Sequence, residues 1–248
     1  MRRLSLLMSA LLILSAAVSA QTVDELIAKT AAARGGLAKL KAVQTVRLTG
    51  NFETNGIQAG FVEVAKRPNK LRRDITVQGM NMIQSYDGHN GWQIIPFTGK
   101  TDPEIMTGDD LKGIQEEADT DGPLLDYKTK GNKVELVGKE KVNGKDAYNL
   151  KVTLSTGTVR NIYLDTDTFF AVKTSAKVTR GGTESTVESF LSDYKEANGI
   201  MVPFTVAVQI DGGATTQKIT FEKVEFNVAV DDAVFIMPAP APPATPKP

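Results

Sequence analysis

The feature that most constrains the fold is a succession of short segments in which apolar residues occupy every second position. The clearest of them contains Val202, Phe204, Val206, Val208 and Ile210. Asn-Gly or Asp-Gly pairs, which are hairpin signals, separate such segments at 55–56, 87–88, 143–144, 198–199 and 211–212. Parallel strands would need long crossover connections instead of short turns. The pattern therefore predicts an antiparallel meander of about ten or eleven strands.

Two stretches favour helices. The first runs from Thr22 to Val43, begins with a capping box formed by Thr22 and Glu25, and is interrupted by Gly35-Gly36. The second, Thr101–Tyr127, is acidic and has apolar residues at helical spacing, and Pro123 predicts the start of a further short helix within it. A large sheet must have its apolar face covered. We therefore expect a mainly β fold, in which an N-terminal helix and a helical insert cover the concave side of a strongly curved antiparallel sheet.

The two ends of the chain predict an exported protein with a single domain. Arg2 and Arg3 precede an apolar run that ends in Val18-Ser19-Ala20, the order found in a cleavable signal peptide. We expect residues 1–20 to be removed, although a retained signal anchor is the alternative. The next residue is Gln21 and the chain has no cysteine, so no lipid anchor is expected.

The remaining chain is expected to form one domain over residues 21–238, followed by a disordered Pro-rich tail at 239–248. Deleting Ala239–Pro248 is predicted to leave the thermal unfolding midpoint almost unchanged, which a melting curve would test.

The residues that usually carry catalysis are scarce. The 29 basic and 29 acidic residues leave no positive charge for nucleic acid, and the single histidine, His89, lies in a predicted turn. The segments Asp119–Gly122 and Asp165–Asp167 do not complete a calcium loop. We therefore expect no metal, no cofactor and no enzymatic activity. A glycosidase with two carboxylates stays open, because its acids need no recognisable spacing.

Three segments resemble the LolA/LolB-like lipoprotein carriers of bacterial envelopes. They are the strand and turn at 60–71 with its Lys66-Arg67-Pro68-Asn69 sequence, the segment Tyr86–Trp92, and the ending at 231–238. The resemblance covers most of the chain after residue 20 and implies an incomplete β-barrel with a helical lid over an apolar cavity for acyl chains. It also implies that Arg67 holds the lid closed by bonding to the helices, and a solvated turn residue is the alternative for Arg67.

The alternation and the resemblance together give candidate site residues. The expected cavity wall consists of Phe61, Leu71, Ile75, Val77, Met80, Met82, Trp92 and Ile94. The expected inner face of the lid consists of Leu111, Ile114, Leu124 and Leu125. A register error of one residue would move any of these side chains to the other face of the sheet.

The function that follows is a soluble periplasmic carrier. It would bind acyl chains of lipoproteins or lipids and move them towards the outer membrane, as a monomer, between membrane-bound donor and acceptor proteins. The chain is longer than compact carriers of the family and looks more like the broad group of outer-membrane lipoprotein-sorting proteins, so the cargo stays open between lipoproteins, free lipids and glycolipids. The alternative is an envelope sensor or interaction module that binds lipidated protein without transport.

Overall fold

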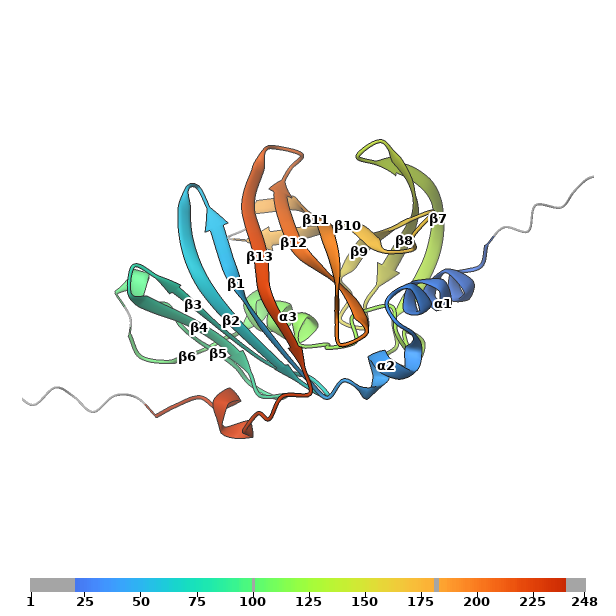
Figure 1. Cartoon of the computed structure of the whole chain (residues 1–248). Coiled ribbons are helices and arrows are strands. Elements are labelled where there is room, and N and C mark those ends of the chain that lie inside the picture. Colours follow the sequence, from blue (N-terminus) through green and yellow to red (C-terminus); the bar gives the residue numbers. More distant parts are fainter. Residues whose placement is uncertain (1–20, 100, 181–182, 240–248) are drawn as a thin grey trace, which may run out of the picture.

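The fold is a single antiparallel sheet of thirteen strands with three α-helices, seen in a computed structural model that describes residues 21–99, 101–180 and 183–239 (Figure 1). The expected signal peptide at 1–20 and nearly all of the expected tail lie outside the described residues. The helices are α1 (Val23–Ala33), α2 (Leu37–Ala42) and α3 (Gly108–Glu117), with short 3₁₀ turns at η1 (Pro96–Thr98) and η2 (Asp232–Phe235).

The strands are β1 (Thr45–Thr54), β2 (Ile57–Lys66), β3 (Lys70–Val77), β4 (Met80–Tyr86), β5 (Gly91–Ile94), β6 (Glu104–Ile105), β7 (Lys133–Val142), β8 (Lys145–Thr153), β9 (Val159–Asp165), β10 (Ala171–Arg180), β11 (Thr183–Ala197), β12 (Ile200–Ile210) and β13 (Thr215–Phe226). The number exceeds the prediction because segments such as β6, two residues long, are too short to show an alternation.

The strand order explains the open shape of the sheet. The order is β6-β5-β4-β3-β2-β1-β13-β12-β11-β10-β9-β8-β7, so consecutive strands are neighbours except where β1 pairs with β13. The chain thus makes two meanders whose outer strands, β6 and β7, are not paired with each other. Figure 1 shows the two limbs curving away from β1 and β13. This confirms the predicted strongly curved, incomplete barrel.

The predicted hairpin signals join strands as expected. Asn55-Gly56 connects β1 to β2 with φ of 49° and 77°, the left-handed backbone that a tight hairpin needs. The pairs at 143–144, 198–199 and 211–212 have the same conformation. Gln78-Gly79 also adopts it, with φ of 50° and 79°, between β3 and β4. That turn was missed because glutamine is not a usual residue for this position.

The N-terminal segment forms two helices over the sheet. The capping box is present, since Thr22 Oγ1 accepts from the Glu25 amide at 3.2 Å and Glu25 Oε2 accepts from the Thr22 amide at 2.9 Å. Leu26 of α1 is fully buried against the apolar face of β8 and β9. Leu40 of α2 packs with Leu125 and Ile200.

Gly35 and Gly36 separate the two helices and give a matched test of this junction. A Cβ on Gly35, whose φ is +114°, would lie 2.2 Å from the backbone oxygen of Gly199, whereas a Cβ on Gly36 at φ +98° would meet open space. We expect Gly36→Ala to lower the free energy of unfolding by about 1–2 kcal/mol through backbone strain alone. Gly35→Ala should lower it by more than about 3 kcal/mol, because a backbone clash is added. Urea unfolding of both variants checks this, and equal losses would contradict it.

The insert crosses the concave side of the sheet. Ile114 of α3 packs with Leu71 and Tyr86, and Glu117 forms an ion pair with Arg73 of β3 at 2.9 Å. On the other side of the same helix, Glu116 pairs with Arg160 of β9 at 2.6 Å. Helix α3 therefore connects the two limbs of the sheet, which confirms that the insert covers the concave face.

The second short helix predicted at Pro123 is absent. Residues 120–131 form consecutive turns. Gly122 and Asp126 have φ of +68° and +53° and flank Pro123–Leu125, so a helix cannot continue through either residue. We refer to 119–131 as the turn segment.

The C-terminal residues cover the opposite face of the sheet. Phe235 of η2 is fully buried, and its carbonyl oxygen accepts from Trp92 Nε1 at 2.7 Å and from Ser85 Oγ at 3.1 Å. Trp92 and Ser85 face each other in the β4–β5 register, so both lie on the face that α3 does not cover. Both faces of β3–β5 are therefore packed.

Candidate functional site

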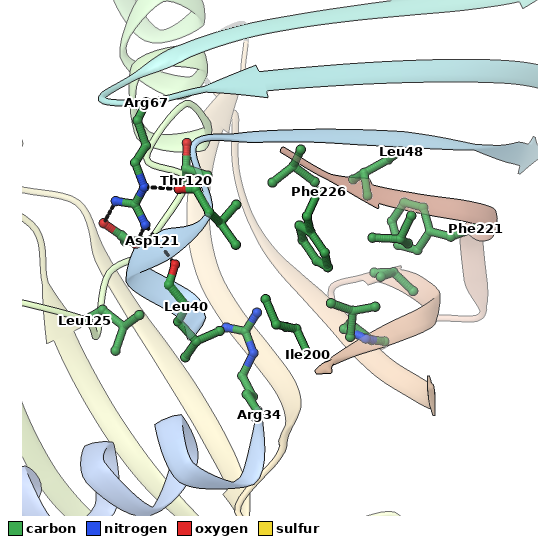
Figure 2. Close-up of a pocket in the computed structure, with 16 residues that line it drawn as sticks. Arg34, Leu40, Leu48, Arg67, Thr120, Asp121, Leu125, Ile200, Phe221 and Phe226 are labelled. Atoms are coloured by element: carbon green, nitrogen blue, oxygen red, sulfur yellow. Dashed lines mark hydrogen bonds and ion pairs between the residues drawn. The ribbon is translucent and has the colours of Figure 1, made fainter. Parts of the chain in front are cut away.

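An apolar pocket of about 280 Å³ lies between the N-terminal helices, the central strands and the turn segment (Figure 2). Its apolar wall consists of Leu40, Val43, Val46, Leu48, Leu125, Ile200, Val202, Pro203, Val206, Phe221, Val224 and Phe226. The β1–β13 register brings the central part together, because it sets Val46 opposite Phe226 and Leu48 opposite Val224, and directly opposed residues share a face. Four polar residues complete the lining: Arg34, Arg67, Thr120 and Asp121.

Arg67 joins three elements at the edge of this pocket. It lies in the turn between β2 and β3, and its guanidinium donates to the carbonyl oxygens of Val43 and, at 3.1 Å, of Leu40 at the end of α2. It also forms a two-pronged ion pair with Asp121 of the turn segment. The side chains of Arg67 and Asp121 are only 20% and 15% exposed. One side chain therefore connects the sheet to two segments that cover it, α2 and the turn segment, as Figure 2 shows.

A second guanidinium faces the pocket, and none of the carboxylates that the structure describes forms an ion pair with it. Arg34 follows α1, and its Nε donates to the Met201 carbonyl oxygen at a long 3.5 Å. Burial lowers the pKa of Arg34, against the opposing influence of nearby Tyr194 and Asp121. Burial also raises the pKa of Tyr194 to about 12, and the charge of Arg34 acts against this rise. A guanidinium stays protonated in proteins, so Arg34 is a cation on an apolar wall.

Arg73 strengthens the attachment of α3. It forms ion pairs with Glu63 at 2.7 Å and with Glu117 at 2.9 Å, and the attraction of Glu63 is the main reason that the pKa of Arg73 lies above its ordinary value. Glu63 and Arg73 face each other across β2 and β3. The concave face thus holds the insert through three arginines, Arg67, Arg73 and Arg160.

The expected cavity residues divide between two faces of the sheet. Phe61, Leu71, Ile75, Val77, Met80 and Met82 lie on the concave face, because pairing connects them to Leu48 and its neighbours through β2, β3 and β4. None of them lines the pocket, although the Phe61 ring packs edge-on against the pocket residue Phe221 with centroids 5.6 Å apart. The register places Trp92 and Ile94 on the opposite face, opposite Ser85 and Ile83.

The expected lid residues lie in three places. Leu125 lines the pocket. Leu111 and Ile114 pack with Leu71 on the concave face, and Leu124 packs against the cluster under α1. The covering segments therefore meet the concave side at three places, and the pocket lies where α2 and the turn segment meet.

Sequence reasoning missed most of the pocket wall. The alternation at 202–210 was visible, but the partner strands of this segment were not, because β1 and β13 are separated by most of the chain. The period-two patterns that begin at Val46 and at Ile219 were the only signal for these residues.

The turn at His89 shows no reactive arrangement. The His89 side chain is exposed, and the backbone amides of His89 and Asn90 donate to Asp87 Oδ1 at 2.8 and 2.7 Å. These bonds lower the pKa of Asp87 and outweigh the effect of burial, which raises it. Over residues 21–99, 101–180 and 183–239, no group of three or more histidine, aspartate and glutamate side chains is placed to bind a metal ion. No helix of this part of the chain is both long and apolar enough to span a bilayer.

Comparisons with known proteins identify the fold. No protein-family model and no curated protein matches the chain. A LolA superfamily protein from Nitrosomonas europaea superposes with a TM-score of 0.58 at 14% identity, covering 88% of this chain and 98% of the other. A DUF1329 family protein from Desulfovibrio piger gives 0.59 at 14% identity, covering 86% and 97%. The domain of a putative outer membrane lipoprotein-sorting protein from Vibrio parahaemolyticus gives 0.57 at 12% identity, covering 86% and 97%. The chain has a LolA-like fold, as its sequence motifs implied.

Proposed function

We propose that this protein is a periplasmic carrier that binds acyl chains of lipids or lipoproteins on its concave face and moves them towards the outer membrane. The observation that supports this most directly is the apolar pocket beneath covering segments that Arg67, Arg73 and Arg160 hold by polar bonds. Membrane-bound donor and acceptor proteins would load and unload it. The Vibrio parahaemolyticus neighbour is described as an outer membrane lipoprotein-sorting protein, which agrees with this function.

The size of the pocket fits a closed, empty carrier. Its volume of about 280 Å³ is just below the range of about 300–1,000 Å³ found for small-molecule sites. Burying a chain of about 16 carbons is worth on the order of 10 kcal/mol before costs, at about 0.8 kcal/mol per methylene. Cargo binding therefore has enough free energy to move the turn segment and α2 outward against a few polar bonds.

Outward movement of α2 and the turn segment would expose more apolar surface on the concave face. Ile75, Val77 and Met82 are only partly buried and continue the apolar face beyond Phe61 and Phe221. In an opened molecule, the pocket and these residues would form one continuous apolar trough. Phe61 of the expected wall would then contact the cargo, Leu71 would do so only if α3 also moved, and Trp92 and Ile94 would not.

A polar side chain inside the pocket should weaken acyl binding. Val206→Gln places an amide on the wall without a partner, which costs about 1–3 kcal/mol, so affinity for a fluorescent fatty acid should fall about tenfold or more. Ala207→Gln is the matched control, since the next residue of β12 faces away from the pocket. Titration of both variants measures the difference. Equal affinities for the two variants would place the ligand elsewhere.

Native mass spectrometry of protein taken from its own periplasm tests the function itself. We expect a bound adduct whose mass and extracted lipids identify the cargo class. A mass equal to that of the protein alone, together with no uptake of fluorescent fatty acid, would contradict a carrier and would favour an interaction module.

His89→Ala should retain full activity in cells, because the side chain is exposed in a turn.

A further inference from the structure

The polar groups on the pocket wall leave hydrogen-bonding capacity unused. Arg34 carries five N–H donors and makes a single long bond to Met201, and no ion pair to it is formed within the residues that the structure describes. Thr120 Oγ1, at the Arg67 end of the pocket, is buried without a hydrogen-bond partner among the described residues (Figure 2). Figure 2 shows the Arg34 guanidinium between Leu40 and Ile200. The buried Thr120 hydroxyl requires an explanation, since buried polar groups are normally satisfied, and the half-buried Arg34 keeps donors available to a ligand in the pocket.

The lining of the pocket carries a net positive charge. The charged lining residues are two arginines, Arg34 and Arg67, and one aspartate, Asp121. Asp121 is engaged by Arg67 through both carboxylate oxygens. One positive charge therefore remains, and it belongs to Arg34. An apolar wall with one unpaired cation is complementary to an apolar ligand with one negative charge.

We infer that this pocket binds a free fatty acid, with its carboxylate on Arg34 and its chain along the wall formed by β1, β12 and β13. This inference rests on the proposed function and narrows its cargo. A carboxylate matches a planar guanidinium through two parallel hydrogen bonds. The single residual charge and the small volume fit a carboxylate better than a phosphate monoester, which carries nearly two charges at neutral pH.

The test compares two ligands of equal chain length on the full mature chain. Decanoate and decanol compete against a bound fluorescent acyl probe at pH 7.5. We expect wild-type protein to bind decanoate at least about tenfold more tightly than decanol, because a desolvated charge pair discriminates by that order. This comparison needs no variant. Equal binding of the two compounds overturns the inference and leaves the proposed function intact, whereas no binding of either overturns both.

Two variants assign the preference to Arg34. Arg34→Met should reduce the ratio of acid to alcohol affinity to about one, while Arg34→Lys should retain a preference of several-fold because the charge remains. A merely structural effect would lower both affinities and leave the ratio unchanged, so an unchanged ratio in Arg34→Met overturns the assignment.

Lysophosphatidic acid and lysophosphatidylglycerol form the second arm of the test. Tighter binding of either one than of a fatty acid of the same chain length would show a phosphate site and overturn the carboxylate assignment.

Discussion

Replacing Arg67 by leucine should slow the release of a bound acyl chain by about 10- to 100-fold. In the proposed carrier, the guanidinium would stabilise the closed, empty state through its bonds to Asp121 and to the carbonyl oxygens of Leu40 and Val43. Partly buried bonds to a charged group are worth about 1.5–3 kcal/mol, and each 1.4 kcal/mol is tenfold in affinity. Without Arg67 the closed state also contains an unpaired Asp121. The equilibrium therefore shifts towards the open, liganded state.

Arg72 provides a control for this experiment in the neighbouring strand. Its guanidinium pairs with Asp74 at 2.8 Å and donates to the Val234 carbonyl oxygen at 2.8 Å, on the face of the sheet away from the pocket. Arg72→Leu should lower stability while leaving the release rate within about twofold of wild type. Stopped-flow displacement of a fluorescent fatty acid measures both rates. An unchanged rate in Arg67→Leu, or an equal slowing in Arg72→Leu, would remove Arg67 from the release step.

The local features of this fold were predictable because their causes are local. Alternation gives strands, Asn-Gly pairs adopt the positive φ of a tight hairpin, and Thr22 with Glu25 forms a capping box. The Lys66–Asn69 turn was recognisable, but the partner of Arg67 was not. Asp121 lies 54 residues further on, in a segment whose path no periodicity describes.

The inward face of a strand was harder to predict. In β3–β5 both faces are covered, one by α3 and the other by η2, so apolar residues occur on both. Leu71 and Trp92 are equally buried but face opposite sides, and hydrophobicity alone cannot separate them. The pocket wall depends on the pairing of β1 with β13, which closes a loop of nearly the whole chain. Register between distant strands is a property of the assembled sheet.

Truncating Phe235 to alanine should cause the largest loss of stability among these variants, about 3–5 kcal/mol, as expected for an aromatic ring removed from a filled core. The ring is fully buried, and the backbone carbonyl of the same residue accepts from Trp92 and Ser85. The segment is held further by Asp232, which pairs with Lys66 at 2.7 Å and Lys70 at 2.9 Å. These exposed pairs contribute little on their own. The buried ring therefore carries most of the docking free energy.

Ile236 is the matched control, since the next side chain in the same segment is 58% exposed. Ile236→Ala should change the free energy of unfolding by less than about 0.5 kcal/mol, as is usual for a surface substitution. Guanidinium unfolding with a common slope for all variants measures both. Under conditions where the Phe235→Ala variant is folded, its affinity for acyl ligands should equal that of wild type, because η2 and the pocket lie on opposite faces of the sheet. If Phe235→Ala lowers the free energy of unfolding by less than about 1 kcal/mol, η2 does not stay packed on Trp92 in solution. The stably folded part of the chain would then end with β13.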